Sequence, residues 1–502
     1  MKIFNKYILT LFVLTSIISC SEYLDVNTSP NDPTADVIGP ELILPAAQNG
    51  SYSAKTATQN QFGLILTNQW AGDVTNFTGG NVDEYRFNVT ATFYSGIWNN
   101  AYLAADKLQA VISIDSPENS YFTAIAKVLK VQTMQYVVDI YGDAPYTEAF
   151  QRGENYQPAY DNASDIYKSL FIELTEAINL INGAGIEAVN PGLSDVMLGG
   201  DMDMWKKFAN TLRLKLLVRA SSSSDGDVQS WVSSSWAAVK SLPFLGVGEN
   251  ITTNPGYGNG NGQQNYFWER YGFTTDGNQT QSNKFIVGSQ YFIEYLKGSN
   301  AVSPVGAFDA RITAFFKTAS SSSGNYQGVI QGADDPEDAT IGLSYIGTGL
   351  LAAPSQDGLY FSASESLFLQ AEAALNGKIS GDAQSFFESG IKSSFSYYGL
   401  SSRVTNYLTG ISGKNGIGWS TSDNLEAIIR QKWTALHGID GAEIFIEHNR
   451  TGFPNAPLPT LATKAHRPYR LLYPTSELNG NTANVPSVSA SAIFAPAIFY
   501  QK

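Results

Sequence analysis

The segment DNASDIYKSLFIELTEAINLIN, residues 161–182, decides the architecture to expect from this sequence. Its apolar residues recur every three or four positions, which is the spacing of one face of an α-helix. They are Ile166, Leu170, Leu174, Ala177, Ile178 and Ile181. Asp161 or Ser164 is the expected N-cap. The segment therefore predicts a long amphipathic helix that buries one stripe of side chains against a neighbour.

The same period recurs along the chain. One stripe consists of Trp205, Phe208, Leu212 and Leu216, and another runs from Leu367 to Leu375 and ends at Asn376-Gly377, a typical C-cap. Further helices are expected near 94–114, 121–140, 283–297, 383–397 and 424–436. Strand-like alternation is scarce. We therefore expect a mostly α protein, a tetratricopeptide-like scaffold of helix pairs with long irregular loop insertions, although the full repeat signature is absent.

Composition narrows the class of protein. The chain has 502 residues, 43% of them hydrophobic, and a net charge of −14 with a single Cys. A chain of this length and hydrophobic content can build a large core. One Cys excludes a disulfide scaffold. The negative charge argues against binding of nucleic acid, which requires an excess of Lys and Arg.

The N-terminus has the features of an export signal. Lys2 and Lys6 precede an apolar run from Tyr7 to Ile18, which is too short to span a bilayer comfortably. The run ends at Ser19-Cys20, so we expect residues 1–19 to be a lipoprotein signal peptide and Cys20 to carry the lipid. An ordinary signal peptide followed by a chance Cys is the alternative. Residues 20–45 contain several prolines and predict a tether, and residues 46–502 predict a single domain.

Two loop regions combine aromatic rings with amide and charged side chains. The first runs from Trp70 to Phe87, and the second is NPGYGNGNGQQNYFWERYG, residues 254–272. Rings beside directional hydrogen-bonding groups suit a sugar, which has apolar C–H faces ringed by hydroxyls. We expect ligand contacts, foremost at Trp268 and Tyr271, from the following residues: Trp70, Phe77, Tyr85, Tyr257, Tyr266, Trp268 and Tyr271.

Motifs for catalysis or metal binding are lacking. The sequence has no HExxH, GxSxG or GxxxxGK[ST] motif. His437, His448 and His466 are too few and wrongly spaced for zinc. The acidic turn from Asp334 to Asp338 is either a solvated turn or a loose calcium site. We expect a protein that is not an enzyme and has no cofactor.

Six further segments, in order along the chain, carry a family resemblance. They are CSEYLDVNTSPNDPT (20–34), YGDAPYTEAF (141–150), MWKKFANTLRLKLLVRA (204–220), SESLFLQAEAALNG (364–377), RQKWTALHGIDGAEIFIEHNRTGFP (430–454) and RPYRLLYPTSEL (467–478). Together they resemble the SusD/RagB family of nutrient-binding outer-membrane lipoproteins, in particular its SusD-like subgroup. The resemblance implies a mostly helical fold with tetratricopeptide-like units. It also implies a lipid-anchored, surface-exposed protein of the outer membrane that caps a SusC-like TonB-dependent transporter.

Within these segments the charged residues favour structural roles. Glu365 and Glu372 are seven residues apart on one helical face and are expected to bind a neighbouring element. Arg450, Arg467 and Arg470 lie beside turns and are expected to pack there.

Proteins of this family typically capture glycans, and some relatives capture peptides. Because ligand loops differ most among relatives, the binding residues above are chosen by composition. The sequence thus predicts non-catalytic capture of an oligosaccharide for a transporter. A peptide ligand and a surface glycoside hydrolase are the alternatives.

Overall fold

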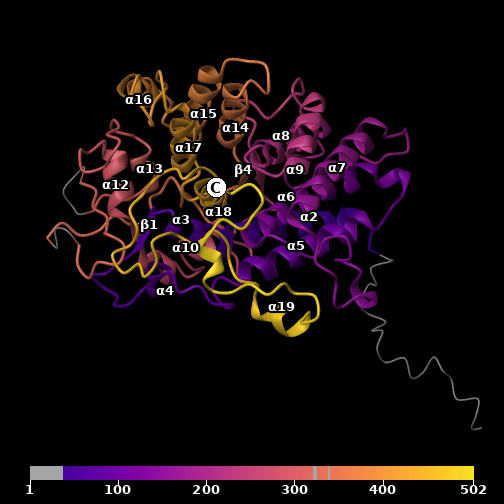
Figure 1. Cartoon of the computed structure of the whole chain (residues 1–502), viewed down its shortest axis with the longest axis horizontal. Coiled ribbons are helices and arrows are strands. Elements are labelled where there is room, and N and C mark those ends of the chain that lie inside the picture. The colour runs from indigo at the N-terminus through magenta and orange to yellow at the C-terminus, as the bar shows by residue number, and fades with distance from the viewer. Residues whose placement is uncertain (1–37, 320–324, 337–339, 502) are drawn as a thin grey trace, which may run out of the picture.

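The computed structural model describes residues 38–319, 325–336 and 340–501, which are mostly helical (Figure 1). The helices are α2 (Pro40–Ala54), α3 (Asn60–Leu66), α4 (Val82–Arg86), α5 (Gly96–Ile112), α6 (Ser120–Tyr141), α7 (Ala163–Asn182), α8 (Met202–Ala220), α9 (Gly226–Ser235), α10 (Tyr266–Tyr271), α11 (Gln281–Phe285), α12 (Gln290–Lys297), α13 (Ile312–Phe315), α14 (Ala363–Leu375), α15 (Ala383–Tyr397), α16 (Val404–Ile411), α17 (Asn424–Ala435), α18 (Gly441–Thr451) and α19 (Thr475–Gly480). Two antiparallel strand pairs join β1 (Trp70–Gly72) to β3 (Ile286–Gly288) and β2 (Ile251–Thr253) to β4 (Gly358–Phe361). The mostly α class is confirmed.

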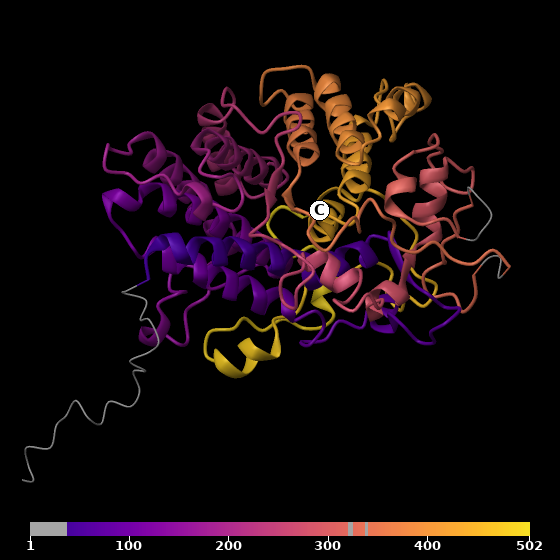
Figure 2. The same cartoon turned by 180° about the vertical axis from the view of Figure 1, so that it is seen from behind.

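Helix pairs form the scaffold, as expected. Helices α5, α6, α7 and α8 pack each on the next, and α14 packs on α15, α17 and α8. Figure 1 shows α5 to α9 on one side of the molecule and α12 and α13 on the other, with α18 near the centre. The view from behind shows the same arrangement (Figure 2). Stacked antiparallel pairs of this kind are the tetratricopeptide-like units that the sequence predicts.

The helix ends show how the local sequence sets the boundaries. Helix α14 ends in a Schellman motif: Lys378 N donates to Ala373 O (2.8 Å) and Gly377 N to Ala374 O (2.9 Å). Gly377 has a φ of 64°, a conformation that glycine adopts without strain. The predicted N-cap of α7 was wrong, because the side chain of Asn162, which lies between the two candidates, accepts the hydrogen bond from Ser164 N (3.0 Å).

Two predicted boundaries are corrected. The helix expected over 283–297 is interrupted, since Ile286–Gly288 forms strand β3 and α12 begins only after Ser289, whose hydroxyl caps it. The buried, β-branched Ile286-Val287 pair favours a strand once β1 is available as a partner. The tether expected over 20–45 ends earlier, because α2 begins at Pro40, where proline suits the first helical turn. Cys20 and the signal peptide lie outside the described residues.

Acidic and basic side chains from distant helices meet in the core. Glu443 on α18 binds Lys215 of α8 at 2.6 Å and Lys432 of α17 at 2.6 Å, and it also pairs with Arg219 of α8. Each of these four side chains is at most 3% exposed. We refer to the group as the ionic cluster, which consists of Asp139, Lys215, Arg219, Glu365, Glu372, Lys432, Glu443, Glu447 and Arg450.

The cluster accounts for the two glutamates singled out in the sequence. Glu365 binds Lys215 at 2.8 Å, and Glu372 binds Arg450 at 2.6 Å. Both therefore bind a neighbouring element, as expected, and Arg450 has the expected packing role. Burial alone would raise the pKa of Glu447, but Arg450, Lys432 and Arg219 lower it to about 2.

The lowered pKa values of two buried histidines predict that the fold loses stability in acid. Burial, with a smaller contribution from Arg467, lowers the pKa of His448 to about 3, and burial also lowers the pKa of His437. Each neutral ring therefore stabilises the fold fully above pH 6.5, its ordinary pKa, and this stability is lost as the pH falls toward the folded pKa. We expect His448 alone to account for a loss on the order of 2 kcal/mol between pH 6.5 and 4.5.

Urea unfolding at these two pH values measures this loss. His448→Asn has no ring to titrate and should show a smaller loss than the wild type. An equal loss in the variant and the wild type would show that His448 is not a source of the acid sensitivity.

Candidate functional site

The second aromatic loop is fixed to the fold by Asn265. Its side chain caps α10 by accepting from Phe267 N (2.9 Å) and Trp268 N (3.2 Å). Its amide also donates to Gln356 O (3.1 Å), and its backbone N donates to Pro354 O (2.8 Å). The loop is therefore held against segment 354–357, which precedes β4.

Three tyrosines gather where this loop meets α2. The Tyr257 hydroxyl donates to Asn49 Oδ1 (2.6 Å), and Asn49 Nδ2 donates to the Tyr266 hydroxyl (3.4 Å). The Tyr266 ring lies 6.4 Å from that of Tyr257 and 6.4 Å from that of Tyr52, between ring centroids. Tyr257 and Tyr266 are half-buried, so part of each ring faces solvent.

Polar side chains lie beside these tyrosines. Asp357 is exposed, and its Oδ1 accepts from Asn254 Nδ2 (2.7 Å). Burial raises the pKa of Tyr52, so its hydroxyl stays protonated and can donate. We call this region the tyrosine surface, which consists of Asn49, Asn254, Tyr257, Tyr266, Asp357 and Tyr397, with the buried Tyr52 beneath it.

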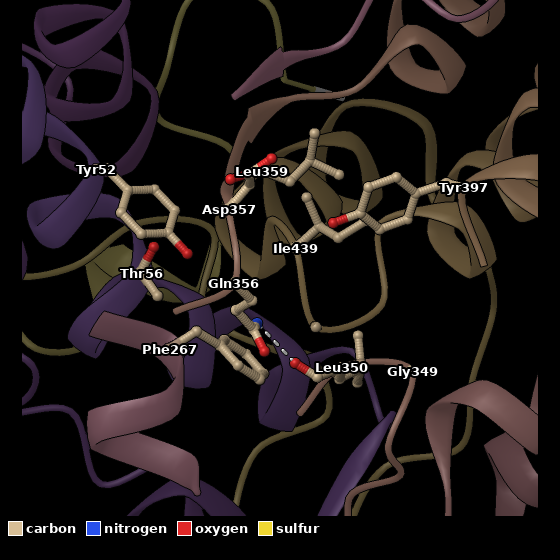
Figure 3. Close-up of a pocket in the computed structure, with 11 residues that line it drawn as sticks. Tyr52, Thr56, Phe267, Gly349, Leu350, Gln356, Asp357, Leu359, Tyr397 and Ile439 are labelled. Carbon is tan, nitrogen blue, oxygen red and sulfur yellow. Dashed lines mark hydrogen bonds between the residues drawn. The ribbon is translucent and has the colours of Figure 1, made fainter. Parts of the chain in front are cut away.

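A small cavity opens beneath the tyrosine surface (Figure 3). The hydroxyls of Tyr52 and Tyr397 point inward from opposite sides, with Asp357 between them. Tyr397 ends α15 and is 42% exposed. The cavity volume of about 40 Å³ is enough for a water molecule but too small for a sugar ring. A ligand would therefore lie across the rim of this cavity.

One wall of the cavity comes from an irregular turn between α2 and α3. A π-helical turn over Lys55–Gln59 separates α2 from α3 and carries Thr56 into the lining. Such turns often mark functional sites. The same turn directs Lys55 to Asp440 at 2.8 Å, so the cavity wall is tied to the N-terminus of α18.

The first aromatic loop borders a separate cavity of about 270 Å³. Phe77 and Phe285 meet edge to face there, with ring centroids 5.4 Å apart. Asp73 is buried, and its carboxylate accepts from Asn76 Nδ2 (2.7 Å) and from the Tyr345 hydroxyl (2.7 Å). We call this cavity the phenylalanine pocket. Its combination of rings and polar groups matches the composition expected of a ligand loop.

Three of the predicted contact residues belong to the core instead. Trp70 and Tyr271 are fully buried and pack edge to face at 5.1 Å, and Tyr85 is 4% exposed. Trp70 is buried because β1 pairs with β3. Tyr85 is held against β1, because its hydroxyl accepts from Gly72 N at 3.0 Å. The rings of Trp70 and Tyr271 offer no face to a ligand, and the prediction for these two was wrong. Tyr85 also lines the phenylalanine pocket, so its role in ligand binding stays a prediction.

The other four predicted residues remain at the surface. Tyr257 and Tyr266 form part of the tyrosine surface, and Phe77 lines the phenylalanine pocket. Trp268 is half-buried and packs against Phe273, with ring centroids 5.5 Å apart. Their role in ligand binding stays a prediction.

The sequence patterns did not predict Asn49, Tyr52, Asp357 and Tyr397 as part of the site. Asn49 and Tyr52 are three residues apart on α2 and so share a face. That spacing was a visible signal, but nothing in the sequence showed which loop would cover this face.

The predicted calcium turn is only partly described. Asp334 lines the phenylalanine pocket, whereas Glu337 and Asp338 lie outside the described residues. Within the described ranges, no group of three or more His, Cys, Asp or Glu side chains is placed to hold a metal ion.

Comparison with known families decides the assignment. A model of the SusD-like proteins, described as starch-binding and associating with the outer membrane, matches residues 30–474. The chain belongs to the SusD-like family. No curated protein sequence gives a significant match.

Several solved structures share this SusD-like fold. One is a chitin-binding SusD homologue from Flavobacterium johnsoniae, with a TM-score of 0.71 and 21% identity, covering 91% of this chain and 98% of that one. A chitin-binding protein has a TM-score of 0.67 and 24% identity over 89% of this chain and 95% of that one. A SusD homologue from Bacteroides thetaiotaomicron has a TM-score of 0.66 and 23% identity over 88% and 92%. These similarities support the SusD-like fold.

The family description places SusD-like proteins at the outer membrane. Among the helices of the described residues, none is both long enough and apolar enough to cross a bilayer.

Proposed function

We propose that this SusD-like protein is a non-catalytic surface lipoprotein that captures oligosaccharides at the tyrosine surface. The observation that carries the proposal is the cluster of half-exposed tyrosine rings beside Asn254 and Asp357. The family description as starch-binding, and the two similar structures described as chitin-binding, support a glycan as the ligand.

The chemistry of the surface fits a neutral sugar. Tyr257 and Tyr266 offer apolar ring area to the C–H face of a sugar ring. The exposed Asp357 carboxylate accepts hydrogen bonds from the hydroxyls of a sugar. Since the cavity itself is small, recognition would take place along an extended surface, which suits a chain of sugars.

Binding is favoured over hydrolysis by the number of carboxylates. Glycoside hydrolases typically use a pair of carboxylates across the scissile bond. Among the described residues that line the cavity, Asp357 is the only acid. The lining of the cavity therefore supplies one carboxylate rather than the pair that hydrolysis typically uses.

The cellular setting of the proposal follows the family. The protein would be anchored in the outer membrane through lipid on Cys20, face the exterior, and pass its ligand to a SusC-like TonB-dependent transporter. Several acyl chains on one residue would make a stable anchor.

Loss of one tyrosine ring should weaken binding. We expect Tyr266→Ala to lower the affinity for a bound oligosaccharide about tenfold, because a stacked ring contributes roughly 1 kcal/mol or more. A glycan array identifies the ligand, and isothermal titration calorimetry measures the change. Tyr156→Ala is the control, because Tyr156 is 81% exposed and lies in the connection between α6 and α7.

The outcomes separate the alternatives. Unchanged affinity in Tyr266→Ala, with circular dichroism like that of the wild type, would remove the tyrosine surface as the site. Unchanged affinity in Trp268→Ala would exclude Trp268 as a ligand contact. Shortened oligosaccharides after incubation would indicate a hydrolase, and peptide found in the purified protein would indicate a peptide-binding relative.

A further inference from the structure

A third cavity lies between the end of α18 and the segment that follows it. Its volume is about 410 Å³, which is within the range of small-molecule sites. Its polar lining consists of His448, Asn449, Asn455, His466, Arg467 and Tyr469. We call it the arginine pocket. No residue of the tyrosine surface lines it.

Among the described residues, Arg467 is a buried cation without a carboxylate partner. It is 5% exposed, and its guanidinium donates to the backbone carbonyls of Leu66, Ala456 (3.0 Å) and Pro457 (2.7 Å). Within the described part of the chain no Asp or Glu forms an ion pair with it. Burial accordingly lowers the pKa of Arg467 to about 10, which shows how poorly its charge is compensated.

The other buried arginines of the described residues have different partners. Arg219, Arg311, Arg430 and Arg450 each bind a carboxylate. Arg213 and Arg470 have no carboxylate partner among the described residues, but each lies over an aromatic ring, and neither lines the arginine pocket. Arg467 thus combines a missing counter-ion with a cavity beside it.

The rest of the lining adds no negative charge. None of the described residues of the arginine pocket is an acid, although the chain carries a net charge of −14. Asn455 and His466 are exposed at the rim, where an amide and an imidazole can donate to a ligand. His448 contacts Pro454 O through Nδ1 at 3.2 Å. The pocket therefore offers donors and positive potential to an incoming group.

We propose that the arginine pocket binds an oxyanion, the carboxylate or sulfate carried by an acidic saccharide. An oxyanion would supply the negative counter-charge that Arg467 lacks. It would replace solvent rather than a protein partner. The proposal rests on the proposed function for one point only, that the anion is carried by a saccharide.

The test compares matched ligands on the purified full chain. Calorimetric titrations use an oligogalacturonate, the neutral galactose oligomer of the same length, and sodium sulfate alone. We expect the acidic oligomer to bind at least tenfold more tightly than the neutral one. The double variant Asn455→Ala/His466→Ala should reduce this preference about fivefold and leave the affinity for the neutral oligomer unchanged.

Two further variants address the buried charge. Arg467→Met should abolish the preference for the acidic oligomer, whereas Arg467→Lys should retain part of it. If Arg467→Met does not fold, the rim variant decides, because its two side chains are exposed. Asn479→Ala, an exposed amide on α19, is the control and should behave as the wild type.

The failures of the two proposals can be told apart. Equal affinity for the acidic and neutral oligomers together with no binding of sulfate, or an undiminished preference in the rim variant, would overturn the arginine pocket as an anion site. Binding of sulfate alone without any preference for the acidic oligomer would overturn its assignment to a sugar. Binding of no oligosaccharide across a glycan array would instead overturn the proposed function.

Discussion

Glu443→Ala should destabilise the protein by about 3–5 kcal/mol or prevent folding altogether. The substitution leaves Lys215, Arg219 and Lys432 buried without the carboxylate that joins them. Burial alone would raise the pKa of Glu443, yet these three cations hold it well below its ordinary value, so the carboxylate is charged in the fold. Removing it costs more than the lost contacts, because three desolvated cations then repel one another.

Urea unfolding of matched variants measures this effect. Glu443→Gln keeps the shape of the side chain but removes its charge, and it should be nearly as harmful as the alanine variant. Lys392→Ala removes a surface pair with Glu388 and should change the free energy of unfolding by less than about 1 kcal/mol. Stability of Glu443→Gln within about 1 kcal/mol of the wild type would contradict an essential charge at this position.

Trp70→Ala should cost about 3–5 kcal/mol of stability without changing ligand affinity per folded molecule. Trp70 is fully buried, and its ring packs against Tyr271 and, at 6.1 Å between centroids, against His437. Truncation would leave a large cavity beneath β1, since packing around a short strand pair cannot close fully over a lost indole.

The same titration used for Tyr266→Ala provides the comparison. Trp70→Ala should lower the midpoint of urea unfolding and leave the dissociation constant of the folded protein unchanged. Tyr266→Ala should raise the dissociation constant and leave the midpoint unchanged. A Trp70→Ala variant with wild-type stability and weakened binding would restore Trp70 to the ligand site and contradict its placement in the core.

The helical part of the fold could be predicted because its signal is local. The stripe from Ile166 to Ile181 and the Asn376-Gly377 cap both act within a few residues, and both predictions hold in the structure. The helix predicted over 283–297 failed for the opposite reason. Strand β3 exists only because β1 lies beside it, and β1 is more than 200 residues earlier in the chain.

The candidate site was harder to predict because core and surface aromatics have the same composition. Tyr271 and Tyr266 occur in the same short helix, yet one is fully buried and the other faces solvent. The helical period separates them only when the buried direction is known. That direction depends on α2, whose Asn49 binds Tyr257 across 208 residues of sequence.

The position of Lys215 has a consequence for how the chain can be made. Its two carboxylate partners, Glu365 and Glu443, both follow it in sequence, the nearer by 150 residues. A chain growing from its N-terminus therefore carries this cation without either carboxylate until Glu365 has been added, although Tyr136, whose hydroxyl lies 3.4 Å from Lys215 Nζ, is already present. Burial of an ammonium without a counter-ion is unfavourable, so we expect the final packing of α8 to follow the addition of α14 and α18.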